Sequence, residues 1–79
     1  MTREELIEVF KIAKENKNDI YVAVTIPGQK DVEYIVNKHK SLTNKLEYYC
    51  NTYDENGIHC KNDQIRIVDA GCIDFYIGE

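Results

Sequence analysis

The chain has 79 residues, of which 43% are hydrophobic and 30% are charged. This composition excludes wholesale disorder, and the length indicates one domain over residues 1–79 that buries only about 60% of its unfolded surface. Residues 41–79 hold three Lys and Arg against seven Asp and Glu, which accounts for the whole net charge of −4. Bulk electrostatic binding to nucleic acid is therefore disfavoured, whereas an acidic surface suits a basic protein partner.

The start of the chain is charged from Arg3 onward, and no apolar run reaches the length of a signal sequence or a transmembrane helix. Cys50, Cys60 and Cys72 are an odd number of cysteines and cannot all pair within one chain. Both observations favour a cytoplasmic protein with free thiols and no membrane association.

A capping box opens the first predicted helix. The Thr2 hydroxyl can accept from the Glu5 amide, while the Glu5 carboxylate can accept from the Thr2 amide. The apolar stripe that follows has helical spacing and consists of Leu6, Ile7, Val9, Phe10 and Ala13. The pattern predicts a helix over residues 3–15.

The apolar period then changes from 3.6 to 2, which is typical of a strand over residues 20–26. Pro27 and Gly28 follow, with proline suited to the first central position of a turn and glycine to the second. A second strand is expected over residues 31–36, with Tyr34 and Val36 on one face although Ile35 blurs the alternation. These segments predict a β-hairpin.

A second helix is predicted over residues 42–55 from a stripe formed by Leu42, Leu46, Tyr49, Cys50 and Tyr53. Gly57 suits the left-handed position that ends such a helix. Segments 64–69 and 72–77 are rich in strand-forming residues, and the intervening pair 70–71 is expected to turn or bulge.

The element order is therefore α-β-β-α-β-β in a single two-layer α+β domain. Because strands adjacent in sequence usually pair, the sheet is expected to be mostly antiparallel with two helices on one face. The other face would be partly open to solvent and is the expected place for function.

Catalytic and metal-binding constellations are weak. No cysteine opens a helix, and no nucleophile motif links Cys50, Cys60 or Cys72 to His39 or His59. Zinc ligands are present by type, but the close cysteine pair of structural zinc sites is missing. The sequence therefore predicts no enzyme, no catalytic residue, no cofactor and no metal.

Tyrosines near carboxylates form the candidate partner-binding set. Six tyrosines in 79 residues is a high number, and Tyr21, Tyr48 and Tyr76 do not fit the apolar faces of their elements. With Asp69 and Asp74 they would make an acidic surface with aromatic anchors. The alternative is that A/T-rich coding raises the tyrosine content and these rings only cover apolar edges.

Four segments carry a resemblance to a known group of proteins, namely 2–7, 11–15, 45–49 and 65–68. They read TREELI, KIAKE, KLEYY and IRIV, and in these the chain resembles small phage and prophage proteins of Firmicutes. The similarity spans most of the chain and its motifs are structural. It implies a phage accessory protein in the host bacterial cytoplasm, a class that includes anti-CRISPR and other anti-defence proteins.

The functional expectation is a phage-encoded inhibitor that binds a host defence protein, such as a CRISPR effector, and occludes one of its functional surfaces. Direct contact with nucleic acid is not expected. Two alternatives stay open. One is an oligomeric module that sequesters a nucleotide signal, although Arg66 is the only arginine after Arg3. The other is a structural or assembly factor of phage particles.

Overall fold

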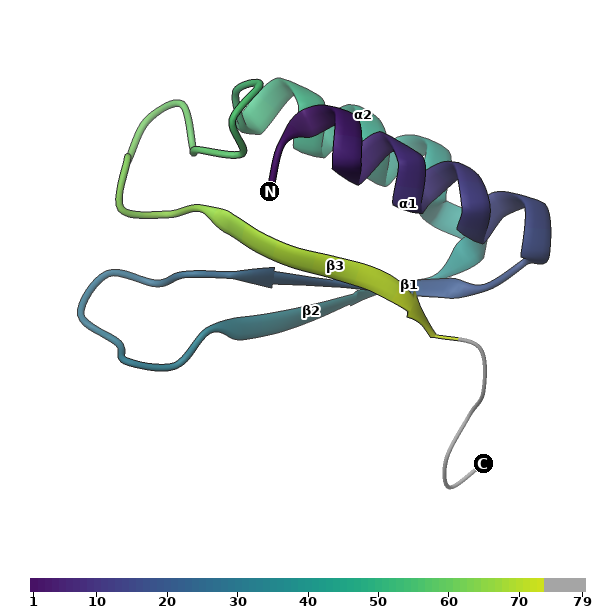
Figure 1. Ribbon diagram of the computed structural model, residues 1–79, viewed down its shortest axis with the longest axis horizontal. Coiled ribbons are helices and arrows are strands. Elements are labelled where there is room, and N and C mark those ends of the chain that lie inside the picture. Colours follow the sequence, from purple (N-terminus) through teal and green to yellow (C-terminus); the bar gives the residue numbers. More distant parts are fainter. Residues whose placement is uncertain (74–79) are drawn as a thin grey trace.

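The computed structural model describes residues 1–73. Two helices and three strands follow in the order α1 (Arg3–Asn16), β1 (Asp19–Val24), β2 (Glu33–Asn37), a short 3-10 helix η1 (His39–Ser41), α2 (Leu42–Thr52) and β3 (Ile67–Ile73). The sheet is antiparallel with strand order β2-β1-β3, and Figure 1 shows both helices on the same side of it. The predicted α+β class is confirmed. Neither helix described has the length and apolar character needed to cross a membrane.

The capping box and the hairpin turn form as predicted. Thr2 Oγ accepts from the Glu5 amide at 3.2 Å, and Glu5 Oε1 accepts from the Thr2 amide at 2.9 Å. In the turn, the Gln29 amide donates to the Ile26 carbonyl at 3.1 Å, and Gly28 takes a φ of 82°. The positive φ is the reason this position favours glycine.

The prediction for the last strands is wrong at residues 70–71. The chain neither turns nor bulges there, because β3 runs through both positions and places Gly71 opposite Tyr21 on β1. The bulge lies earlier, where Ala23 and Val24 pair with Asp69 and Ile67 and leave Val68 as the extra residue. Residues 1–73 therefore contain three strands, the last of which joins parts of the two predicted late strands, and residues 74–77 of the second of these lie outside the described residues.

Helix α2 is confirmed but ends three residues earlier than predicted, at Thr52. Tyr53 is its C-cap and already has an extended backbone, with φ −116° and ψ 147°. Gly57 does take a positive φ of 78°, but within the turn that follows, where its amide donates to the Asp54 carbonyl at 3.0 Å. The predicted helix-ending role of Gly57 is therefore wrong.

The core lies between the helices and the sheet. Its members include Phe10 on α1, Ile20 and Val22 on β1, and Leu42 and Tyr49 on α2, all of them buried. The Phe10 and Tyr49 rings meet edge to face, with centroids 6.0 Å apart. The buried hydroxyl of Tyr49 donates to Asn37 Oδ1 at 3.3 Å, which satisfies both polar groups.

Candidate functional site

Register places four side chains on the face of the sheet that the helices leave uncovered. Residues directly opposite each other in antiparallel strands point to the same face. Tyr21 on β1 lies opposite Val36 on β2, while Ala23 lies between Tyr34 on β2 and Asp69 on β3. We call Tyr21, Tyr34, Val36 and Asp69 the open-face cluster.

Tyr21 holds this cluster together. Its hydroxyl donates to Asp69 Oδ2 at 3.2 Å, and its ring lies 5.8 Å from the ring of Tyr34 at an interplanar angle of 57°. The ring also passes directly over Gly71, because a Cβ there would come within 2.7 Å of a Tyr21 ring carbon. Glycine is thus needed at position 71 for close approach of the ring, and the ring is held on three sides.

The carboxylate sets the protonation behaviour of this tyrosine. The hydrogen bond to Asp69 is the largest cause that raises the pKa of Tyr21 above its usual value, and partial burial and the negative charge of Asp69 act in the same direction. Raising the pKa in the folded state means that the associated stability is complete below about pH 10 and is lost above it as the phenol ionises. At neutral pH the Tyr21 hydroxyl is therefore protonated, and it donates to Asp69 Oδ2.

The cluster presents apolar surface to solvent. Tyr34 is 63% exposed and Val36 is 55% exposed. Ala23, which lies between Tyr34 and Asp69, is buried. Asp69 is the charged member of the set. An aromatic and aliphatic surface with one oriented carboxylate is typical of protein recognition, because tyrosine rings supply contact area with few rotatable bonds.

The five predicted partner-binding residues have different outcomes. The structure brings Tyr21 and Asp69 together on the open face. Tyr48 is exposed as predicted, but it lies on α2, on the helix side of the sheet, where its ring packs edge-on against Tyr49 at 5.2 Å. Asp74 and Tyr76 lie outside the described residues.

Sequence reasoning did not include Tyr34 and Val36 among the candidate partner-binding residues. Both were placed on one face of their strand, as observed, but that face was not distinguished from the core face. The usable signal was Ile35, which lies opposite Val22 and packs against the core, so its neighbours must point to the open face.

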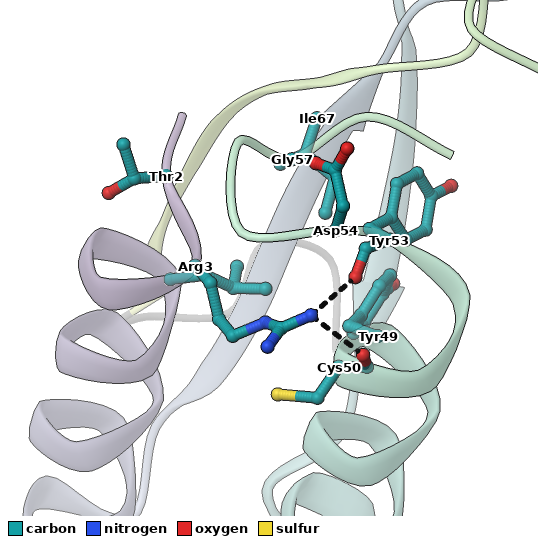
Figure 2. Close-up of a pocket in the computed structure, with 9 residues that line it drawn as sticks. Thr2, Arg3, Tyr49, Cys50, Tyr53, Asp54, Gly57 and Ile67 are labelled. Carbon is teal, nitrogen blue, oxygen red and sulfur yellow. Dashed lines mark hydrogen bonds between the residues drawn. The ribbon is translucent and has the colours of Figure 1, made fainter. Parts of the chain in front are cut away.

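A small cavity between the start of α1 and the end of α2 is a packing feature. Figure 2 shows Arg3 reaching across to α2, where one guanidinium nitrogen donates to the carbonyls of Cys50 at 3.1 Å and Tyr53 at 2.9 Å. These carbonyls belong to the last turn of the helix and its cap, where a cation is favourable. The cavity has a volume of about 10 Å³, which is room for a single water molecule.

Burial has a strong effect on Tyr53, which lines this cavity. Desolvation raises the pKa of Tyr53 from about 10 to about 12, with smaller contributions from Tyr48 and Tyr49. The neutral phenol is thus the folded form, and its contribution to stability is complete below pH 10 and lost between about pH 10 and 12. This is the behaviour of a core residue at the end of a helix.

The two histidines make hydrogen bonds to nearby parts of the chain. His59 Nδ1 accepts from the Lys61 amide at 3.0 Å, and the His59 ring packs edge-on against Tyr53 at 5.3 Å. His39 donates its amide to the buried Asp19 carboxylate at 2.8 Å, which fixes η1 to the start of β1. The three cysteines are free thiols, and residues 1–73 contain no group of three potential metal ligands close enough to share an ion.

Two shallow grooves lie elsewhere on the surface. One, of about 390 Å³, lies between α1 and α2, and the other, of about 400 Å³, lies beside the end of α2. The first carries both basic and acidic side chains on its lining, so its charge selects no class of ligand; its residues are Ile7, Phe10, Lys11, Lys14, Glu15 and Leu46. The open-face cluster remains the best-defined candidate site in the described part of the chain.

Comparison of the chain with protein-family models, with curated proteins and with solved structures found no match. Function is therefore inferred from the chemistry of the open-face cluster.

Proposed function

We propose that this protein binds another protein through its open-face cluster and inhibits it by covering a functional surface. The observation that supports this most strongly is the locked position of Tyr21, with its ring over Gly71 and its hydroxyl on Asp69. A ring that is already fixed loses little conformational entropy on binding, so the cluster is preorganised for recognition. Tyr34 and Val36 extend the same surface with exposed apolar area.

The charge of the chain favours a basic partner surface. The net charge is −4, and Asp69 is a carboxylate at the β3 side of the cluster. Complementary charge accelerates association and orients the complex, while the aromatic side chains supply most of the binding energy. A basic surface that normally contacts nucleic acid or another acidic group is a target of this kind, and covering it would inhibit the target.

The resemblance to phage and prophage proteins gives the target a context. Within that context the partner is a component of host defence, and a CRISPR effector is the most specific version because such proteins carry extended basic channels. A nucleotide is a poorer fit to the cluster, because Asp69 would repel a phosphate and the cluster supplies no cation.

Substitutions matched for exposure test this proposal. The tagged protein is used to capture its partner from an extract of a defence-carrying host, and the affinity of each variant for that partner is then measured. Tyr34→Ala is expected to weaken binding by about 30-fold or more, as for a hot-spot tyrosine. Asp69→Lys is expected to slow association and reduce its dependence on salt.

Tyr48→Ala is the control, because Tyr34 and Tyr48 are 63% and 52% exposed, but Tyr48 lies on α2. Its affinity is expected to stay within about threefold of the parent protein. Full affinity of the folded Tyr34→Ala and Asp69→Lys variants would show that the open-face cluster is not the binding surface.

A further inference from the structure

The outer edge of β2 is exposed and unprotected. Within residues 1–73, β2 pairs on one side with β1 and has no strand on its other side. Natural proteins usually protect such an edge with a proline, a lysine that points inward, a bulge or a covering segment. The sequence of β2 is Glu-Tyr-Ile-Val-Asn, without proline or lysine, and its register with β1 is regular throughout.

The opposite edge of the sheet differs. β3 carries a bulge at Val68, and a bulge bends a strand so that a further strand pairs poorly with it. Between the two edges of the sheet, β2 is thus the one suited to pairing with another chain.

The flanks of β2 carry opposite charges. Lys30, Asp31 and Glu33 precede or begin the strand, with a net charge of −1, while Lys38 and Lys40 follow its end, with a net charge of +2, and all five residues are exposed. Lys38 is held at this end by the buried Asp19, with 3.3 Å between its Nζ and Asp19 Oδ2. When two such strands pair antiparallel, the acidic end of each lies beside the basic end of the other, so the strand is complementary to itself.

We propose that a second copy of this chain pairs antiparallel with the free edge of β2, forming one continuous sheet from two three-stranded sheets. With Ile35 at the two-fold axis, Tyr34 of each copy lies opposite Val36 of the other. Pairs of an aromatic and a β-branched residue stabilise antiparallel strands, and here two equivalent pairs form. In this register the open faces of the two sheets lie on the same side of the combined sheet, and the two core faces lie on the other side.

The dimer extends the candidate binding surface. Both open-face clusters come to lie on one side of the combined sheet, joined through Tyr34 and Val36. The free edge of β2 is not required for the proposed function, since a monomer can also present its own cluster. Dimer formation can be measured without a target protein.

Sedimentation equilibrium of the purified protein tests the proposal. A single pair of edge strands is a small interface, so the expected dissociation constant lies between about 10 μM and 1 mM. The mass is expected to rise with concentration from 9.2 kDa towards twice that value, and less steeply at high salt. A mass of 9.2 kDa at every concentration up to about 1 mM would overturn the proposal.

A matched pair of variants identifies the edge. Val36 on β2 and Val68 on β3 are 55% and 45% exposed, so lysine at either position is tolerated by the fold to a similar degree. Val36→Lys is expected to raise the dissociation constant at least about tenfold, because each lysine faces an apolar Tyr34 and adds positive charge to the interface. Val68→Lys is expected to change it by less than about threefold, since an exposed position outside the contact has little effect.

Equal effects of the two variants, or a larger effect of Val68→Lys, would contradict pairing through β2. If Val36→Lys is not folded by circular dichroism, Glu33→Lys replaces it, because it removes the acidic end of the strand and is exposed. Hydrogen exchange gives the second readout, with amide protection in residues 33–37 increasing with protein concentration. Concentration-independent exchange in these residues would also overturn the proposal.

Because these experiments use the purified chain alone, their failure leaves target binding by the open-face cluster unaffected.

Discussion

Replacement of Phe10 by alanine is expected to lower the free energy of unfolding by about 3–5 kcal/mol, as for other buried phenylalanines. Phe10 is fully buried between α1 and the sheet, and its ring contacts Tyr49 edge to face. A cavity at this position removes contacts from both helices at once. In a domain of this size such a loss is a large part of the total stability.

Urea unfolding followed by circular dichroism measures this effect, with Ile7→Ala as the control on the same helix. Ile7 is 40% exposed and lines the groove between α1 and α2, so its truncation is expected to cost about 1 kcal/mol or less. Equal destabilisation by the two substitutions would show that the buried face of α1 has been assigned incorrectly.

Gly57→Ala is expected to destabilise the protein by at least about 2 kcal/mol. The left-handed backbone at this position, with φ 78°, costs a residue with a Cβ of order 1–3 kcal/mol. In addition, the new Cβ would overlap the backbone carbonyl oxygen of Met1. The first residues would have to move, and they are tied down by the Arg3 amide, which donates to the Glu55 carbonyl at 2.9 Å, and by the Met1 ammonium, which donates to the Ile67 carbonyl at 3.0 Å.

Gly28→Ala separates the two contributions to this effect. Gly28 has a similar φ of 82°, but a Cβ there would have no atom within 4 Å. Its substitution is therefore expected to cost about 1–2 kcal/mol, from backbone strain alone. Thermal unfolding of both variants gives the comparison, and a Gly28→Ala variant less stable than Gly57→Ala would contradict the role assigned to the contact with Met1.

Local patterns predicted the helices well because helical periodicity and capping are properties of neighbouring residues. The stripe on the second helix correctly identified Leu42 and Tyr49 as core residues. Leu46 shares that stripe but is only partly buried, at the groove between the two helices. The extent to which the Leu46 side chain is buried depends on how α1 packs against α2, and that contact cannot be predicted from either helix segment alone.

The late strand shows where sequence reasoning failed. Glycine after alanine was taken to interrupt a strand, since glycine is most often found in turns and bulges. In the folded protein Gly71 instead accommodates the Tyr21 ring from a strand 50 positions earlier in the chain. A long-range contact of this kind leaves no local trace, because the same residue type serves both purposes.

The candidate site was predicted only in part, for a related reason. Alternation along the first strand correctly placed Tyr21 on the open face, whereas Asp69 was selected as a carboxylate of the acidic second half of the chain. Their direct hydrogen bond follows from the register between β1 and β3, which includes a bulge that the sequence does not locate. Tyr48 was grouped with them on its exposure alone, although its place in the second predicted helix already put it on the helix side of the sheet.

Hydroxyl-radical footprinting of the protein with its captured partner tests the central claim most directly, because oxidation reports the solvent exposure of each side chain. Tyr34 and Tyr48 are both exposed in the free protein, so each serves as the reference for the other. Binding through the open-face cluster predicts that oxidation of Tyr34 and Val36 falls in the complex while oxidation of Tyr48 is unchanged. Protection of Tyr48 with continued oxidation of Tyr34 would show that the partner binds the helices and would contradict the proposed function.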